Sequence, residues 1–244
     1  MLSKTRLKYI QTLGQKKFRD SEGLFIAEGP KVAEELLKEK EVKIREIFAL
    51  EQWAGEYGIL AKNTTLSIIS EVELERISQL ITPNQVLAVI EQFPLQPFKA
   101  EKNSFTLVLD DIRDPGNLGT IIRLADWFGI SKIVCSTFSA DIYNPKVVQS
   151  TMGSIARVKF FYTELEEWLA EQEVNSYAAV LDGRSIHDMQ GVKEGIVIIG
   201  NESRGIHDNL LQHVNEKLTI PRIGKAESLN AAVATAIILS HLVK

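Results

Sequence analysis

Short apolar runs alternate with helical stretches through the second half of the chain, and this alternation restricts the fold more than any other feature. The continuous apolar run Phe105–Leu109 predicts a strand, and the apolar spacing over Ile121–Phe128 predicts the helix after it. The same reasoning predicts strands at Ile133–Ser136, Tyr177–Leu181, Ile196–Ile199 and Lys217–Ile220, and helices at Pro145–Ile155, Glu164–Gln172 and Leu229–Leu242. Such alternation is typical of parallel β-α-β crossovers, so we expect an α/β domain with a parallel sheet.

The first half of the chain carries a second, smaller α/β pattern. Apolar residues recur at helical spacing over Gly29–Lys40, which predicts a surface helix. Strand-like runs surround it at Leu24–Ala27, Ile44–Leu50, Leu66–Ile69 and Val86–Ile90. Pro94 and Pro97 then interrupt regular structure. We therefore expect a small α/β domain at residues 1–95, a linker at 96–104 and a larger domain at 105–244.

Composition excludes several classes of protein. A hydrophobic fraction of 45% with 25% charged residues is typical of a globular chain and unlike that of disordered proteins. No run approaches the roughly 20 apolar residues that a membrane span needs, so we expect no membrane segment. The single cysteine, Cys135, excludes an internal disulfide and favours the cytoplasm. The four histidines show no metal-ligand spacing, so we expect no metal.

The charge distribution is uneven along the chain. A net charge of −4 argues against a protein that coats a polyanion uniformly. The amino-terminal segment is nevertheless basic, because six cations precede the first acidic residue, Asp20: Lys4, Arg6, Lys8, Lys16, Lys17 and Arg19. These residues form either a patch that contacts phosphates or a solvated helix face.

Three polar, glycine-bearing loops follow predicted strands of the larger domain, at residues 110–119, 200–205 and 221–230. In open α/β sheets, ligands bind beyond the carboxyl ends of the strands. We therefore expect the three loops to build one site.

Each loop also has a purely structural interpretation. Asn117 is placed to cap the helix that follows, and Ser228 or Asn230 to cap the last helix. Arg123 stands among apolar helix residues and needs a partner, which Asp126 or a loop aspartate would supply as a structural ion pair. Residue by residue, these alternatives stay open.

Taken together and in order, the loops resemble the three motifs of the SpoU (TrmH-type) RNA 2′-O-ribose methyltransferases. The motifs are Asn117-x-Gly119-x-x-x-Arg123-x-Ala125, Gly200-Asn201-Glu202-x-x-Gly205, and Ile220-Pro221 with Ser228-Leu229-Asn230. In the first half, Lys17-Phe18-Arg19, Phe25-Ile26-Ala27-Glu28-Gly29 and Thr82–Val89 resemble the small ribosomal-protein-like domain with which many members hold RNA.

The resemblance implies a fold, a cofactor and partners. The fold would be α/β, with a carboxy-terminal α/β-knot (a trefoil-knotted parallel sheet flanked by helices) preceded by a small α/β ribosomal-protein-like domain. Sequence pattern alone would exclude a knot, because knots are rare. The cofactor would be S-adenosylmethionine, the substrate RNA, with rRNA favoured over tRNA, and the protein a homodimer through its carboxy-terminal domain. The basic amino-terminal residues become expected RNA contacts.

The resemblance also assigns roles to residues. Backbone groups of Thr137, Gly200, Ile220 and Leu229 would hold the cofactor. Arg123 would position a phosphate and stabilise the developing alkoxide, since a guanidinium with a pKa above about 12 is a poor base; phosphate-assisted proton transfer through Arg123 stays open. Asn117 would orient Arg123 or the ribose, Glu202 would anchor its loop or a partner arginine, and Ser228 with Asn230 would order the third loop.

Two other classes remain as alternatives. A non-catalytic RNA-binding protein could retain the methyltransferase fold, although Asn117, Arg123, Glu202 and Asn230 are all present. A dinucleotide-binding dehydrogenase would need a Gly-x-Gly-x-x-Gly segment after an early strand, which this sequence lacks.

Overall fold

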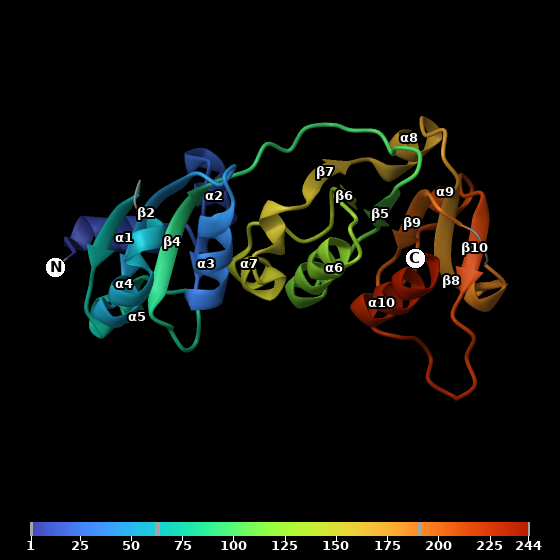
Figure 1. Cartoon of the computed structure of the whole chain (residues 1–244). Helices are drawn as coiled ribbons and strands as arrows, with labels where there is room; N and C mark the ends of the chain where they lie inside the picture. Colours follow the sequence, from blue (N-terminus) through green and yellow to red (C-terminus); the bar gives the residue numbers. More distant parts are fainter. Residues whose placement is uncertain (1, 62–63, 190–191, 244) are drawn as a thin grey trace. The chain divides into compact units, whose positions relative to one another are not determined.

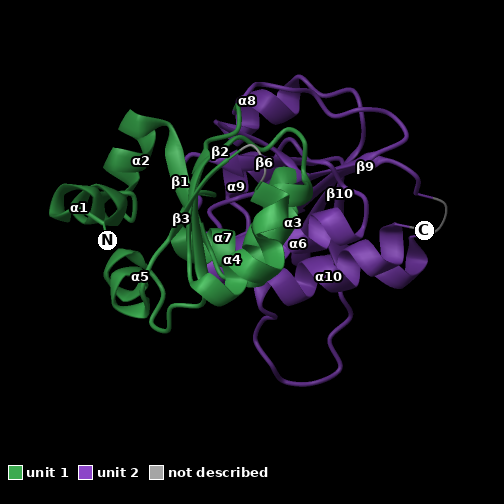
Figure 2. Cartoon of the chain, turned by 60° about the vertical axis from the view of Figure 1, so that its left-hand side comes forward, with its two compact units in different colours: residues 1–94, 141–156 green, residues 95–140, 157–244 purple. Residues whose placement is uncertain are grey.

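The computed structural model describes residues 2–61, 64–189 and 192–243. The chain divides into two compact units (Figure 2). Unit 1 contains Met1–Pro94 and Asp141–Ala156, and unit 2 contains Leu95–Ala140 and Arg157–Lys244. The chain therefore passes between the units three times.

Unit 1 is built on a mixed sheet. Its described residues form four strands in the order β1-β4-β2-β3, in which β1–β4 and β4–β2 are antiparallel and β2–β3 is parallel. The strands are β1 (Leu24–Glu28), β2 (Ile44–Ala49), β3 (Thr65–Ile68) and β4 (Val86–Glu91), and the helices are α1 (Lys4–Thr12), α2 (Lys16–Glu22), α3 (Pro30–Lys38), α4 (Glu51–Tyr57), α5 (Glu71–Ile77) and α7 (Pro145–Thr151). The predicted strands and the surface helix are confirmed, whereas α1, α2, α4 and α5 were not predicted because they are short and largely polar.

A segment from the second half of the sequence completes the core of unit 1. The ring of Tyr143 lies 5.0 Å from that of Phe25, measured between centroids, and its hydroxyl donates to the carbonyl oxygen of Phe93 at 2.9 Å. Burial raises the pKa of Tyr143, so this hydroxyl stays protonated and donates. Residues 141–156 lie within the range expected for the larger domain, and their contacts join them to unit 1.

Arg19 is internal to unit 1 and has a structural role. It is 2% exposed, and its guanidinium donates to the carbonyl oxygens of Leu13 and Gly14 and to Asp141 Oδ2 at 2.6 Å. A buried charge is tolerated only when it is paired and hydrogen-bonded. The expectation that Arg19 contacts RNA is therefore replaced by an ion pair that fastens residues 141–156 to the amino-terminal part of unit 1.

Unit 2 is built on a parallel sheet, as predicted. Within the described residues its strand order is β10-β8-β9-β5-β6-β7, and every neighbouring pair is parallel. The strands are β5 (Phe105–Leu109), β6 (Lys132–Ser136), β7 (Lys159–Thr163), β8 (Ser176–Ser185), β9 (Gly195–Ile199) and β10 (Glu216–Thr219), and the helices are α6 (Pro115–Trp127), α8 (Leu165–Ala170), α9 (Asp208–Leu211) and α10 (Ala231–Leu242). β7 and α9 were not predicted.

Helices cover both faces of this sheet. Val108, Val134 and Ile198 form one core cluster with Trp168 of α8 and Leu210 of α9. Because strand side chains alternate between faces, the intervening residues point to the opposite side, where α6 and α10 lie side by side (Figure 1). Residues 92–104 form no helix or strand, and Phe98 packs on unit 2 through Phe161.

The starts of α6 and α10 correct one prediction and confirm another. The N-cap of α6 is Asp114, whose Oδ1 accepts from the amide of Asn117 at 2.8 Å, so the prediction that Asn117 caps this helix is wrong. Proline is favoured at the first position of a helix, so Pro115 starts α6 and the residue before it, Asp114, is the N-cap. Asn230 is the N-cap of α10.

β8 approaches β10 so closely that only glycine fits at one position. The register between the two strands shifts between Lys217, opposite Ala178, and Leu218, opposite Arg184. A Cβ atom on Gly183 would lie 2.6 Å from the backbone of Leu218. The long strand β8 therefore depends on Gly183 at this crossing.

None of the described helices combines the length and the apolar character that a membrane span requires.

We predict that Gly183→Ala lowers the free energy of unfolding by about 1–3 kcal/mol, because a backbone contact cannot yield as a flexible side chain can. Urea denaturation measures this change. Gly224→Ala is the matched control, since a Cβ there meets nothing within 4 Å. Equal stability of the two variants would contradict the close approach.

Candidate active site

The three predicted loops of unit 2 start at one edge of the sheet. Leu109, the last residue of β5, pairs with Cys135 of β6 on one side and with Ile199 of β9 on the other. Since these strands are parallel, the loops after β5, β6 and β9 begin side by side at their carboxyl ends. Two of the three predicted loops, those after β5 and β9, thus start side by side, and the third follows β10, which is parallel to β8 in the same sheet.

A chain of side-chain hydrogen bonds joins the three loops. Asn117 Nδ2 donates to Glu202 Oε1 in a short contact, and Asn117 Oδ1 accepts from Asn230 Nδ2 at 2.8 Å. Asn117 stands in the first turn of α6, Glu202 in the loop after β9, and Asn230 at the start of α10. Residues that are 85 and 113 positions from Asn117 in sequence therefore meet at one amide.

The hydrogen bonds of Asn230 fix the orientation of both side-chain amides in this series, those of Asn230 and Asn117. Asn230 Oδ1 accepts from the amides of Ala232 at 3.0 Å and Val233 at 3.2 Å, so its Nδ2 must face Asn117. Asn117 then presents its oxygen to Asn230 and its nitrogen to Glu202, which as a carboxylate can only accept. The side chain of Asn117 is bonded to Glu202 and Asn230, and its expected role in orienting Arg123 or the ribose stays a prediction.

The second loop is a tight turn held by Asn201. Asn201 and Gly205 exchange two backbone hydrogen bonds, of 3.0 and 2.9 Å, and Asn201 Nδ2 donates to the carbonyl oxygen of Asp111 at 2.9 Å. A Cβ on Gly200 would lie 2.3 Å from the backbone of Gly205, so residue 200 has to be glycine. The role of Asn201 was not predicted, although its place in the second motif marks it.

The backbone groups expected to hold a cofactor fit that task. Thr137, Gly200 and Ile220 follow β6, β9 and β10, and Leu229 precedes the cap of α10. Across the described residues, no backbone hydrogen bond outside helices and strands engages Thr137, Gly200 or Leu229. The third loop, residues 221–230, is exposed throughout and includes Ser228. Free amides and carbonyls at the end of a sheet can bind adenine without particular side chains.

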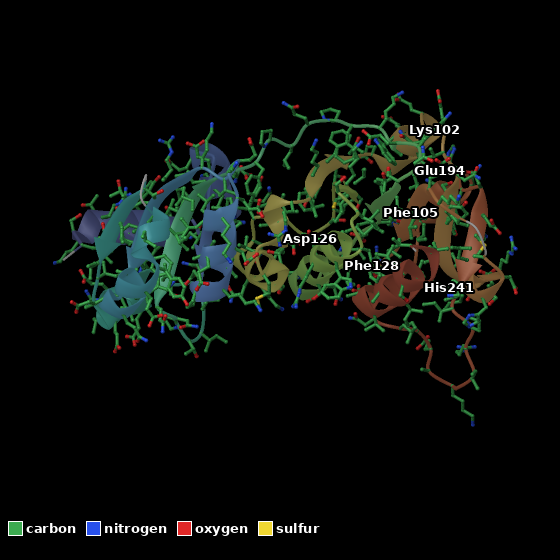
Figure 3. All side chains as sticks on the ribbon, in the orientation of Figure 1. Lys102, Phe105, Asp126, Phe128, Glu194 and His241 are labelled. Atoms are coloured by element: carbon green, nitrogen blue, oxygen red, sulfur yellow. The ribbon has the colours of Figure 1, made fainter. Side chains whose placement is uncertain are left out.

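Arg123 faces a groove rather than an acidic partner. Asp126 pairs with Arg157 at 2.8 Å, and Asp111 pairs with Arg113 at 2.7 Å. Within the described residues Arg123 forms no hydrogen bond or ion pair, so the structural ion pair that remained open is not formed. The groove has a volume of about 520 Å³ and also contains Trp127 of α6 and Ile237 of α10. Asp126 lies in the last turn of α6, and Phe128 directly follows the helix (Figure 3).

Two ionisable groups near the edge of the sheet, Arg113 and Cys135, have shifted pKa values. Asp111 raises the pKa of Arg113 above its ordinary value through a hydrogen bond and its charge, so Arg113 stays cationic. Burial raises the pKa of Cys135 to about 12, which keeps this thiol neutral and unreactive. Among the described residues, no cluster of His, Cys, Asp and Glu could hold a metal ion.

Two of the basic residues of unit 1, Lys4 and Lys8, line a second groove, which also contains Glu22. Lys4, Lys8, Lys16 and Lys17 are exposed, whereas Arg6 pairs with Glu46 and Lys16 with Asp20. Lys4 and Lys8 share one face of α1 and, with Tyr9 and Phe18, line a groove of about 500 Å³. A groove with cations and aromatic rings is suited to nucleic acid.

Family comparisons agree with this architecture. The model of the SpoU rRNA methylase family matches residues 104–240, more than half of the chain. The chain belongs to the SpoU rRNA methylase family. A second model, the MRM3-like substrate binding domain, matches residues 4–88 of this SpoU protein. The family membership predicted from the three loops is confirmed.

Individual relatives match 80% or more of this SpoU protein. The 23S rRNA (guanosine(2553)-2′-O)-methyltransferase RlmP of Bacillus subtilis is 31% identical over 97% of this chain and 95% of its own. The 23S rRNA (uridine(2479)-2′-O)-methyltransferase of Streptomyces viridochromogenes is 27% identical over 80% of this chain and 72% of its own. A crystal structure of AdoMet-bound rRNA methyltransferase from Sinorhizobium meliloti has a TM-score of 0.86 at 31% identity and covers 99% of this chain and 96% of its own. The fold is therefore that of the α/β-knot methyltransferases, as predicted.

The hydrogen bond from Asn230 to Asn117 can be tested by substitution of Asn230. Asn230→Asp keeps an N-cap for α10 but removes the donor to Asn117, so we expect S-adenosylhomocysteine to bind about tenfold more weakly with little change in stability. Asn230→Ala should weaken binding similarly and also lower the free energy of unfolding by about 1 kcal/mol. Isothermal titration calorimetry and urea denaturation measure the two effects. Wild-type affinity in Asn230→Asp would show that the amide chain does not shape the site.

Proposed function

We propose that this protein transfers the methyl group of S-adenosylmethionine to a ribose 2′-hydroxyl of ribosomal RNA. The observation that carries the proposal is the chain Glu202–Asn117–Asn230, which holds the three family loops together at the carboxyl edge of the sheet. Two relatives named above act on different nucleotides of 23S rRNA, so we propose the class of RNA and leave the nucleotide open. The compartment consistent with this substrate and with Cys135 as the sole cysteine is the cytoplasm.

The residues of this chain would divide the work between cofactor and RNA. When bound, S-adenosylmethionine supplies an electrophilic methyl group on a sulfonium. Thr137, Gly200, Ile220 and Leu229 would hold the cofactor through backbone groups, while Glu202, Asn117 and Asn230 keep the surrounding loops in register. Ser228 would help to order the third loop. Arg123, free of any acidic partner in the described residues, would bind a phosphate and stabilise the negative charge that develops on the 2′-oxygen.

The direct test is incubation of the protein with labelled S-adenosylmethionine and 23S rRNA from a strain that lacks it, followed by mapping of 2′-O-methyl positions. Label at a ribose of rRNA is the expected result. Cofactor binding without label in rRNA or tRNA would favour the non-catalytic RNA-binding alternative.

We predict that Arg123→Ala abolishes methylation, by at least about 100-fold, and leaves S-adenosylhomocysteine affinity nearly unchanged. The reason is that the guanidinium acts on RNA and on the transition state, whereas backbone groups hold the cofactor. Single-turnover methylation and calorimetry measure the two effects. Arg184→Ala, on an exposed arginine of β8, serves as the control. Unchanged turnover would remove Arg123 from the mechanism.

We propose further that two copies pair through the groove between α6 and α10. Trp127 is 81% exposed beside this groove, and Val233 of α10 is 48% exposed. Exposed apolar surface of this kind favours burial against a partner. Isologous pairing about a two-fold axis would place Trp127 of each copy against the groove of the other, and Arg123 would then lie at the interface.

We predict that Trp127→Glu converts the protein to a monomer, because the variant loses the apolar area of the indole ring and must desolvate a carboxylate on pairing. Sedimentation velocity measures the change in mass. Leu181→Glu is the matched control, since Leu181 is 73% exposed in the same unit and lies outside the groove. A wild-type protein that sediments as a monomer at all concentrations would contradict the pairing.

We also propose that unit 1 holds the substrate RNA. The supporting features are the groove with Lys4 and Lys8, the exposed Lys16 and Lys17, and the family match to a substrate binding domain. Arg6 would contribute in part, because Glu46 already neutralises its charge. In this proposal residues 1–95 bind RNA, 96–104 link the domains and 105–244 carry the methyltransferase site, with residues 141–156 packed into unit 1.

A further inference from the structure

Asp111 is a buried residue at the candidate active site, and it is the node of a small hydrogen-bond network that includes Ser136, Asn201 and Arg113. It is 1% exposed and has a φ of +60°, a left-handed conformation that residues other than glycine seldom adopt. Its amide donates its hydrogen to Ser136 Oγ at 2.8 Å, and its carbonyl oxygen accepts from Asn201 Nδ2 at 2.9 Å. Asp111, in the loop after β5, is therefore bonded to the last residue of β6 and to the loop after β9. Strain held in this way by surrounding contacts is typical of functional sites.

Arg113 is presented by this node. Its Nε donates to Asp111 Oδ1 at 2.7 Å, and the Asp111 side chain is 2% exposed while that of Arg113 is 57% exposed. Within the described residues Arg113 forms no other hydrogen bond, so its two terminal nitrogens have no protein partner. A guanidinium oriented through Nε with both terminal nitrogens available matches the geometry of a phosphate.

Phe138 is presented by the neighbouring loop. Ser139 donates from its amide to the carbonyl oxygen of Ser136 at 3.0 Å and from its hydroxyl to that of Leu109 at 3.2 Å, and the amide of Ala140 donates to Ile112 at 2.9 Å. The turn around Phe138 is thus fixed at both ends. Phe138 itself is nevertheless 72% exposed. An aromatic ring displayed on a fixed turn beside an active site indicates a contact surface.

Arg113 and Phe138 belong to two loops that are hydrogen-bonded to each other. Ile112, which accepts from the loop of Phe138, directly precedes Arg113, and Ser136 is bonded to Asp111, which holds Arg113. Single-stranded nucleic acid is bound through the same two kinds of group, a cation on the phosphate and an aromatic ring on the base.

We propose that Arg113 and Phe138 bind one nucleotide of the substrate RNA next to the methylation site, with Arg113 on a phosphate and Phe138 stacked on an unpaired base. The assignment rests on the proposed function, since it takes RNA as the substrate. It adds residues outside the three family motifs, and it explains why a strained aspartate and an exposed phenylalanine occur at this edge.

The test is filter binding of labelled 23S rRNA at several salt concentrations. Arg113→Gln keeps a donor for Asp111 but removes the charge, so affinity should fall and the salt slope should decrease by about one. Phe138→Leu should lower affinity by at least about fivefold without changing the salt slope, while Phe138→Tyr should retain affinity, because stacking needs a ring. Arg184→Ala and Leu181→Ala, which alter similarly exposed residues of β8, are the controls.

Two results would overturn the assignment. Wild-type RNA affinity in both Arg113→Gln and Phe138→Leu would exclude a nucleotide contact. Weaker S-adenosylhomocysteine binding by Phe138→Leu in calorimetry, with RNA affinity unchanged, would assign the ring to the cofactor. Loss of RNA affinity through unfolding is recognised by a lowered melting temperature. If the wild type binds RNA through these residues but transfers no methyl group, the proposed function fails and the nucleotide contact stands.

Discussion

The side-chain amide of Asn117 has one donating end and one accepting end, and both are committed within the described structure. Glu202 accepts from the nitrogen and Asn230 donates to the oxygen. Neither end can be exchanged, because the oxygen of Asn230 is already used to cap α10 and a carboxylate at Glu202 offers no hydrogen. The register of α6, α10 and the loop after β9 therefore depends on one amide with a single permitted orientation.

This constraint explains why the residues around the site are small or polar. Gly200 has no room for a Cβ because the turn closes through Asn201 and Gly205, and that turn carries Glu202 to Asn117. Asn201 in turn bonds to the carbonyl oxygen of Asp111. Two linked networks thus hold the same loops from both sides, one through Asn117 and one through Asp111. Coupled polar networks of this kind are stable only when every member is satisfied.

Much of the fold could be predicted from sequence, because buried parallel strands are continuous apolar runs. β5, β6 and β9 were located in this way, and the order of the three loop motifs predicted the family. The short helices α1, α2 and α5 escaped prediction because few of their residues are buried, so periodicity was weak. The role of Arg19 could not be predicted, since its partner Asp141 lies 122 residues away and the basic residues around it indicated an exposed surface.

The buried and the exposed parts of the site are ordered in different ways. Periodicity does not single out Asp111 or Asn201, because both lie in loops and hold them through backbone geometry and bonds between distant segments. The third loop differs again: residues 221–230 are exposed, and their ends are fixed by β10 and by the Asn230 cap. Such a loop buries little apolar surface, so contacts at its ends and a bound ligand must offset the conformational entropy of ordering it. A fixed frame around an exposed loop is the arrangement expected of a site that a bound cofactor completes, and in our proposal Arg113, Arg123 and Phe138 face the RNA.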